Sequence, residues 1–139
     1  MQGLAIAYCD LPAELIEKYQ LEPLVRDRGG ERELWFLRHA KAPLLPVWRD
    51  GQFEVLRWGR RGCGLTWQTT IDSGKCVGAE PIDILASAGY ENGFWFRIRR
   101  GVRGIYWNGE AFMIVTPASY YYRTMTRSDR MPVLIGEII

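Results

Sequence analysis

The sequence predicts a single α+β domain in which a curled, mainly antiparallel and barrel-like sheet is accompanied by a few short helices. Its 139 residues have the length of one domain, and 47% of them are hydrophobic, which supplies enough apolar surface for a core. Short apolar segments alternate with Gly-, Pro- and Asn-containing turns, as is typical of strands joined by hairpins. Because no repeat, linker or low-complexity tract interrupts this pattern, residues 1–139 are expected to form one domain.

Two segments carry the signals of short helices. Apolar residues recur at helical spacing over residues 10–19, where Asp10 is a candidate N-cap. The second helix is expected over residues 117–127, with Thr116 as the N-cap and Pro117 at the first helical position. Both helices are short, so tertiary packing has to stabilise them.

Most of the remaining chain is expected to form strands. The Asp50-Gly51 pair predicts a hairpin turn between two of them. Residues 80–90 fit either a helix that begins at Pro81 or an irregular strand. The expected strands are residues 33–40, 43–48, 53–59, 94–100, 102–107, 111–116 and 130–135, and the expected loops are residues 26–33 and 59–67.

The cysteine and hydropathy patterns limit the class of protein. Cys9, Cys63 and Cys76 are widely spaced and form no C-x-x-C pair, so we expect buried or half-buried thiols rather than a disulfide framework or a zinc site. No cofactor and no metal ligand set is expected. The chain has no run of eighteen apolar residues and no signal-peptide pattern at its start. These patterns predict a cytoplasmic protein without a membrane span.

Arginine dominates the basic residues of the chain. It has fifteen arginines and three lysines, and the formal net charge is +2. Residues 1–56 carry a balance of −2 and residues 57–139 a balance of +4. Guanidinium groups bind phosphate in bidentate fashion and stack on bases, which lysine cannot do. The bias fits a nucleic-acid partner, and it fits an ordinary solvated surface equally well.

Two segments combine arginine with tryptophan. Alternation over residues 94–100 places the aromatic and basic side chains of one parity on the same face of a strand, and residues 57–61 repeat the mixture. Exposed indoles can stack on unpaired bases while guanidinium groups bind phosphates. Alternatively, the tryptophans are core residues and the arginines extend to water. The candidate nucleic-acid-binding residues are Arg57, Trp58, Arg60, Arg61, Trp95, Arg97, Arg99 and Arg130, and binding requires them to meet in one groove.

Four segments, in this order, resemble a known family. They are DLPAELIEKY (10–19), APLLPVWRDGQFEVLRWG (42–59), AFMIVTPAS (111–119) and SDRMPVLI (128–135). Their Arg-Trp-Gly and Arg-Met-Pro-Val motifs resemble those of the SOS response-associated peptidase (SRAP) domain. The resemblance covers most of the chain and implies the SRAP fold. Since family members shield abasic sites in single-stranded DNA, it also implies binding of single-stranded or abasic-site DNA and a role in DNA damage.

The chain departs from the family where the family's chemistry takes place. Family members use an N-terminal Cys, whose amine condenses with the abasic aldehyde and whose thiol closes a stable ring; position 2 here is Gln2. A His normally lies two positions before Arg-Met-Pro, and here that position is Ser128, which does not titrate near neutral pH. For the family's acid/base Glu, the best match is Glu91. The resemblance therefore implies a degenerate site of Glu91 and Ser128 beside Gln2.

These departures predict a pseudo-enzyme that binds DNA without a stable thiazolidine crosslink. The alternative is a catalytically inactive structural or protein-interaction domain that retains only the fold. A third hypothesis is an active lyase that uses the terminal amine, or a peptidase. His39, the only histidine, is expected to be either part of the pocket or an ordinary packed or surface residue. The oligomeric state stays open.

Overall fold

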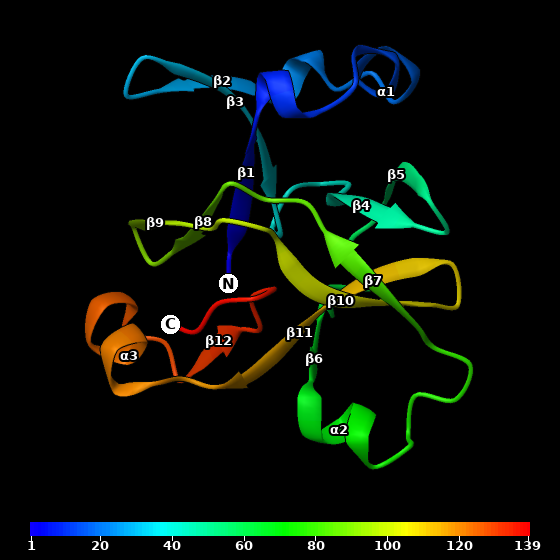
Figure 1. Cartoon of the computed structure of the whole chain (residues 1–139), viewed down its shortest axis with the longest axis vertical. Helices are drawn as coiled ribbons and strands as arrows, with labels where there is room; N and C mark the ends of the chain where they lie inside the picture. The colour runs from blue at the N-terminus through cyan, green and yellow to red at the C-terminus, as the bar shows by residue number, and fades with distance from the viewer.

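Two β-sheets built around one hydrophobic core form the body of the computed structural model, which describes residues 1–139 (Figure 1). The first sheet has the order β2-β3-β1-β8-β9, from β1 (Gly3–Ala7), β2 (Val25–Arg28), β3 (Glu31–Leu37), β8 (Ala88–Glu91) and β9 (Phe94–Arg97). The second has the order β12-β11-β10-β7-β4-β5, from β4 (Leu44–Arg49), β5 (Gln52–Arg57), β7 (Glu80–Ile84), β10 (Val102–Trp107), β11 (Glu110–Pro117) and β12 (Arg130–Pro132). A seventh strand of this sheet, β6 (Leu65–Trp67), pairs with β11 in parallel.

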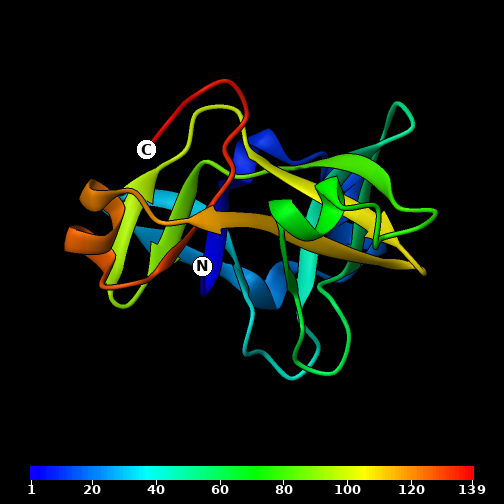
Figure 2. The same cartoon turned by 90° about the horizontal axis from the view of Figure 1, so that it is seen from below.

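Three short α-helices lie at the periphery of the sheets. They are α1 (Ala13–Lys18), α2 (Gln68–Asp72) and α3 (Tyr120–Thr126), and two 3₁₀ turns, η1 (Tyr8–Asp10) and η2 (Glu22–Leu24), flank α1. Figures 1 and 2 show α3 beside β8 and β9 at one side of the molecule and the β4–β5 hairpin at the other. None of these helices has the length and apolar composition needed to cross a membrane.

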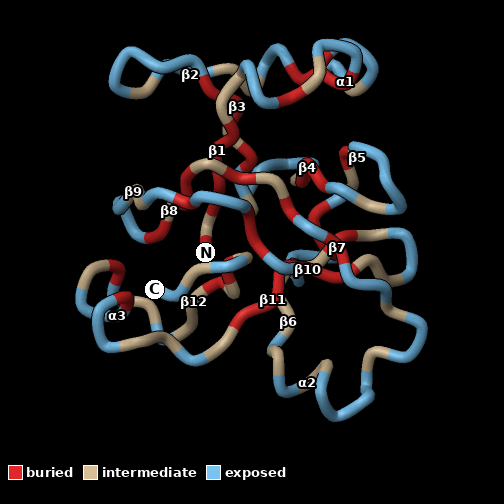
Figure 3. Tube along the Cα trace, in the orientation of Figure 1, coloured by how far each residue is buried: buried red, intermediate tan, exposed pale blue.

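Residues of both sheets form the hydrophobic core. Buried residues run along β1, β3 and β11, whereas α2 and the hairpin turns lie at the surface (Figure 3). The core cluster of 21 residues includes Leu4, Ile6, Leu34 and Phe36 from the five-stranded sheet and Leu45, Val47, Ile84 and Met113 from the other. In β1, Gly3, Ala5 and Ala7 alternate with the core residues Leu4 and Ile6, so this strand presents only small side chains on its outer face.

The predicted α+β class and the mainly antiparallel pairing are confirmed, but no closed barrel is observed. The strands divide into two sheets whose outer strands, β2, β9, β5 and β12, remain edges. The chain passes from one sheet to the other at residues 85–87, where the N–H of Leu85 donates to Pro46 O of β4 and that of Ser87 donates to Ala5 O of β1. This crossing keeps β7 and β8 in different sheets and prevents a continuous curled sheet.

Several predicted segment boundaries are wrong for identifiable reasons. Residues 26–33 form a hairpin rather than a loop, because Gly29 and Gly30 adopt positive φ angles of 61° and 83°. Residues 80–90 form the strands β7 and β8, so the helical alternative for this segment is excluded. Within the expected loop 59–67, β6 forms a strand that pairs with β11.

The predicted helices exist, but both N-caps differ from the prediction. The first α-helix starts after Pro12, which has no capping side chain, whereas Asp10 lies in the preceding 3₁₀ turn. The third starts after Ser119, whose Oγ accepts a hydrogen bond from Tyr122 N at 3.1 Å. Pro117 is instead the last residue of β11, because it pairs with β12. Pairing between strands therefore shortened the expected helix.

Candidate functional site

The α-amine of Met1 is buried at the end of the five-stranded sheet. Its nitrogen lies 3.4 Å from Glu91 Oε2, and both groups are almost completely shielded from solvent. The neighbouring N–H of Gln2 donates to Tyr90 O, which extends the β1–β8 ladder and fixes residue 1 opposite the end of β8. Gly89 makes room for the Met1 side chain, because a Cβ there would lie 2.6 Å from the Met1 sulfur.

Burial changes the protonation of this amine. Desolvation lowers the pKa of the Met1 amine below its ordinary value of 8.0, and the positive charges of Arg38 and Arg130 lower it further. The negative charge of Glu91 raises this pKa and opposes them without overcoming the burial. A lowered pKa increases the neutral, nucleophilic fraction of the amine near neutral pH.

Arg38 and Arg130 line one hollow beside the amine. The hollow has a volume of about 190 Å³, and residues 62–65 complete its wall. Arg38 Nε donates to Met1 O at 3.3 Å, which joins the hollow to the buried terminus. Neither guanidinium forms a salt bridge with a carboxylate. Two unpaired arginines in one concave surface make a site for an anion such as phosphate.

Polar contacts hold the terminus in place. Gln2 Nε2 donates to Asn92 Oδ1 and Gln2 Oε1 accepts from Asn92 N, both at 3.1 Å. Asn92 Nδ2 donates to Thr126 O at 2.7 Å and so connects this pair to α3. Gln2 therefore anchors the first two residues of the chain to Asn92 and, through Asn92, to α3.

Ser128 does not contact the amine. Its Oγ donates to Arg130 O at 2.9 Å and its N–H donates to Thr126 Oγ1, so its polar groups are used within the turn that follows α3. The expected proton-transfer role of Ser128 therefore has no support from a contact. The turn instead positions Arg130 at the hollow.

Tyr122 is a buried polar residue beside this site that the sequence analysis did not identify. Its ring packs edge-on against Phe96, with centroids 5.5 Å apart, and its hydroxyl group has no hydrogen-bond partner. Burial, reinforced by the charge of Glu91, raises the pKa of Tyr122. The hydroxyl consequently stays protonated, and it lies within electrostatic range of the carboxylate.

The predicted role of Trp58 is wrong. Trp58 is only 2% exposed, and its Nε1 donates to Gly64 O at 3.0 Å. The positive φ of Gly59, 71°, turns the chain so that the hairpin of residues 60–63 folds back over this indole. Trp58 therefore fixes the loop that walls the hollow and cannot stack on a base.

The other predicted binding residues do not meet in one groove. Trp95 and Arg97 lie on the outer face of β9, as the alternation predicted. Arg57 belongs to β5, and Figures 1 and 2 show the β4–β5 hairpin at the opposite side of the molecule from β9. Arg60 is paired with Glu110, its Nε 3.1 Å from Oε1. Two further members are exposed: Arg61 at a turn next to the hollow and Arg99 after β9, where its backbone N–H donates to Glu137.

Three aromatic rings gather on the outer face of the five-stranded sheet. The Trp35 and Trp95 rings have centroids 4.9 Å apart, and those of Tyr90 and Trp95 are 5.0 Å apart. With Leu37 they line a hollow of about 300 Å³, and we call these four residues the aromatic surface. Sequence reasoning identified Trp95 but missed Trp35 and Tyr90, because only the strand order brings them together.

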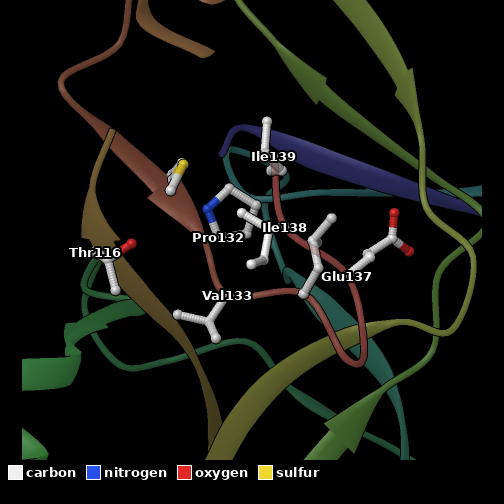
Figure 4. A pocket seen from close by; sticks show the side chains of 8 residues that line it. Thr116, Pro132, Val133, Glu137, Ile138 and Ile139 are labelled. Carbon is white, nitrogen blue, oxygen red and sulfur yellow. The ribbon is translucent and has the colours of Figure 1, made fainter. Parts of the chain in front are cut away.

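A third hollow lies at the C-terminus and has a different character. Figure 4 shows apolar side chains of β12 and of the last residues, including Pro132, Val133 and Ile138, around a cavity of about 140 Å³. Glu137 at its rim is already bonded to the Arg99 N–H. Apart from Glu137, its polar side-chain lining is limited to the Thr116 hydroxyl, and it contains no basic group.

The remaining candidate groups contribute no site. His39 is exposed and forms no side-chain hydrogen bond. All three cysteines are free, and Cys9 and Cys63 are exposed, so the expectation that they are buried or half-buried is wrong for these two. No cluster of His, Cys, Asp and Glu side chains could hold a metal ion.

Comparison of the chain with protein-family models, with curated proteins and with solved structures finds no match.

Proposed function

We propose that the chain is a divergent SRAP-like domain that binds single-stranded DNA at abasic sites without forming a stable crosslink. One observation carries the proposal: the buried amine of Met1, whose pKa is lowered, lies 3.4 Å from Glu91, and Arg38 connects Met1 to a hollow with two unpaired arginines. An abasic site presents an aldehyde between two phosphates. Amine, carboxylate and guanidinium groups are the three kinds of partner that such a ligand requires.

The proposed chemistry is reversible imine formation. The neutral Met1 amine attacks the C1′ aldehyde, the carbinolamine loses water, and Glu91 takes and returns the proton that each step moves. Position 2 carries Gln2, which has no thiol to close a ring, so water hydrolyses the imine and restores the amine and the aldehyde. Cys63 lines the same hollow, and the proposal requires that its thiol does not trap the imine.

Borohydride trapping tests this chemistry. Hydride reduces an imine to a stable amine, so an abasic oligonucleotide should become covalently attached to Met1 only when borohydride is present. Intact-mass measurement first establishes that Met1 carries a free amine. Glu91→Gln should slow trapping, and Cys63→Ser should leave it unchanged. No trapped product, or a crosslink without borohydride that Cys63→Ser abolishes, would contradict the proposal.

The salt dependence of binding tests the arginine hollow. If Arg38 and Arg130 each neutralise one phosphate, replacing both with alanine should reduce the log–log salt slope by about 1.4 in total, since one contact with a single strand contributes about 0.7. Arg57→Ala/Arg103→Ala is the matched control, because it removes the same charge from exposed positions of the seven-stranded sheet. Equal slopes for the two double variants would reject the hollow as the phosphate site.

A protein-interaction domain is the second candidate function. Apolar or aromatic side chains are well exposed at Tyr120 (79%) and at Ile138 (95%), and no segment of the chain covers them. Exposed apolar side chains contribute to a protein interface where they gather in one patch. Sedimentation velocity measures self-association directly, and a tight oligomer together with no binding of DNA at low salt would favour this candidate.

A further inference from the structure

The outer face of the five-stranded sheet is built to bring distant aromatic rings together. In register, Ala5 of β1 lies between Trp35 and Ala88, and Gly3 lies between Leu37 and Tyr90. Strands β3 and β9 are three strand spacings apart, which is about 14 Å. The indoles of Trp35 and Trp95 nevertheless approach to 4.9 Å, because the strands between them have small side chains in the row that the rings cross.

This face is open to solvent. The opposite face of β9 carries Phe96, which packs against Tyr122 of α3, so α3 covers the inner side and not the aromatic surface. Trp35, Tyr90 and Trp95 are all half-buried, and their planes are tilted by 47° and 52° rather than stacked in parallel. Tilted, partly exposed rings leave π-faces that another planar group can cover.

One carboxylate fixes the rings and the cation next to them. Glu33 accepts two hydrogen bonds from Arg28, at 2.9 and 2.8 Å, and a third from Trp35 Nε1 at 3.2 Å. The Arg28 guanidinium in turn lies 4.5 Å from the Trp95 ring centroid. Since Arg28 already occupies the cation position on this ring, a second cation such as a methylammonium group is disfavoured here.

The rim of this face carries charges of both signs, and one group of each sign, Arg97 and Glu31, forms no salt bridge. Arg97 follows Trp95 on the same face of β9 and forms no salt bridge, and with Arg28 it lines a polar hollow of about 390 Å³ that borders the face. Glu33 in that hollow is already neutralised by Arg28. Arg97 lies on the strand that carries Trp95, whereas Glu31 lies at the β2–β3 turn. The β9 side of the surface therefore combines open π-faces with an unpaired guanidinium, which fits a ligand that is both aromatic and anionic.

From this geometry we propose that the aromatic surface, with Arg97, stacks unpaired bases of a single-stranded nucleic acid. The inference rests on the proposed function for the nature of the ligand but assigns a second contact surface. The two surfaces are neighbours along the chain, because Leu37 and Tyr90 directly precede Arg38 and Glu91, which contact Met1. A strand whose bases stack here passes round the end of the sheet to the arginine hollow.

Fluorescence titration with undamaged oligonucleotides tests the proposal, because a stacked base quenches indole emission. The probes are a ten-nucleotide oligothymidine and the corresponding oligouridine, which distinguish DNA from RNA as the natural strand. We expect quenching by at least one of them and a loss of affinity of about 5- to 100-fold for Trp95→Leu, since one base–aromatic stack contributes a factor of that size. Arg97→Glu, which reverses an exposed charge and removes no packed side chain, should also weaken binding.

Trp48→Leu is the matched control. Trp48 is 40% exposed and contacts Phe53 with centroids 4.6 Å apart, but it lies on the seven-stranded sheet. The control should keep the wild-type affinity. Equal affinities for Trp95→Leu and Trp48→Leu, or no quenching by either probe, would overturn the proposal, as would self-association that Trp95→Leu abolishes.

The two proposals fail separately. Loss of borohydride trapping with retained quenching would reject the imine site and keep the aromatic surface. Trapping that proceeds normally while Trp95→Leu and Arg97→Glu bind as tightly as wild type would keep the imine site and reject the aromatic surface. Arg38→Ala/Arg130→Ala should reduce trapping and leave a quenching response at low salt.

Discussion

Replacing Glu91 with Gln tests whether the buried amine is coupled to this carboxylate. The substitution keeps the shape of the side chain and removes the negative charge that lies 3.4 Å from the Met1 nitrogen. Among the groups around the amine, Glu91 makes the largest contribution that raises its pKa. Without Glu91, the amine should therefore lose its proton in the folded state at lower pH than in the wild type.

The titration of the amine sets an upper limit on the pH-dependent cost. The folded amine has a lowered pKa, so between that pKa and the unfolded value of 8.0 the unfolded chain binds more protons, and stability falls as the pH falls. A folded state that keeps the amine fully neutral loses about 1.4 kcal/mol at pH 7, about 2.7 kcal/mol at pH 6 and about 0.1 kcal/mol at pH 9. The pH-dependent deficit of Glu91→Gln relative to wild type cannot exceed these values.

Urea denaturation at pH 6, 7, 8 and 9 measures the deficit as a difference in the free energy of unfolding. Glu33→Gln is the matched control, because Glu33 is equally buried but pairs with Arg28 and not with the Met1 amine. Its deficit should be the same at every pH. The reasoning is refuted if the Glu91→Gln deficit is as large at pH 9 as at pH 6.

Four further predictions concern the same site. Tyr122→Phe should raise the free energy of unfolding in urea by about 1 kcal/mol, because it removes a buried hydroxyl without a partner; a loss of stability would reveal a partner. Trp58→Phe should cost about 1–3 kcal/mol through the lost indole hydrogen bond, yet leave the affinity for oligothymidine unchanged in anisotropy titrations. Gly59→Ala should cost about 3 kcal/mol or more in the same urea assay, since a Cβ would lie 2.0 Å from a backbone oxygen at a positive φ; a near-neutral effect would contradict the loop geometry. Arg38→Ala/Arg130→Ala should move the pH of half-maximal trapping upward, because both cations lower the pKa of the amine; a downward shift in trapping rates across pH 5 to 9 would refute this.

Local patterns predicted the strands and turns whose signals are contained in their own residues. The alternation in residues 94–97 placed Trp95 and Arg97 outward, and Asp50-Gly51 closes the β4–β5 hairpin with φ angles of 52° and 74°. β1 was not predicted, although its alternation of small residues with Leu4 and Ile6 is a strand signal with one buried face. The glycine and alanine content weakens this local signal, because both residues are depleted in strands on average.

The residues that complete the site could not be predicted, because long-range pairing brings them together. Arg38 reaches the terminus through the β1–β3 register, and Asn92 reaches Gln2 through the β1–β8 register. Neither lies in a segment with a recognisable motif. Trp58 was misassigned for the related reason that its burial depends on a carbonyl six residues later, which only the folded loop brings to the indole.

Opposing electrostatic effects on the amine make its reactivity depend on what fills the hollow. Arg38 and Arg130 lower the pKa of the Met1 amine, and Glu91 raises it. A phosphate bound between the two guanidinium groups would cancel much of their positive field and so would raise this pKa. The empty site therefore holds more neutral amine than a site already occupied by phosphate. An aldehyde that reaches the amine before the neighbouring phosphate is seated therefore meets the stronger nucleophile.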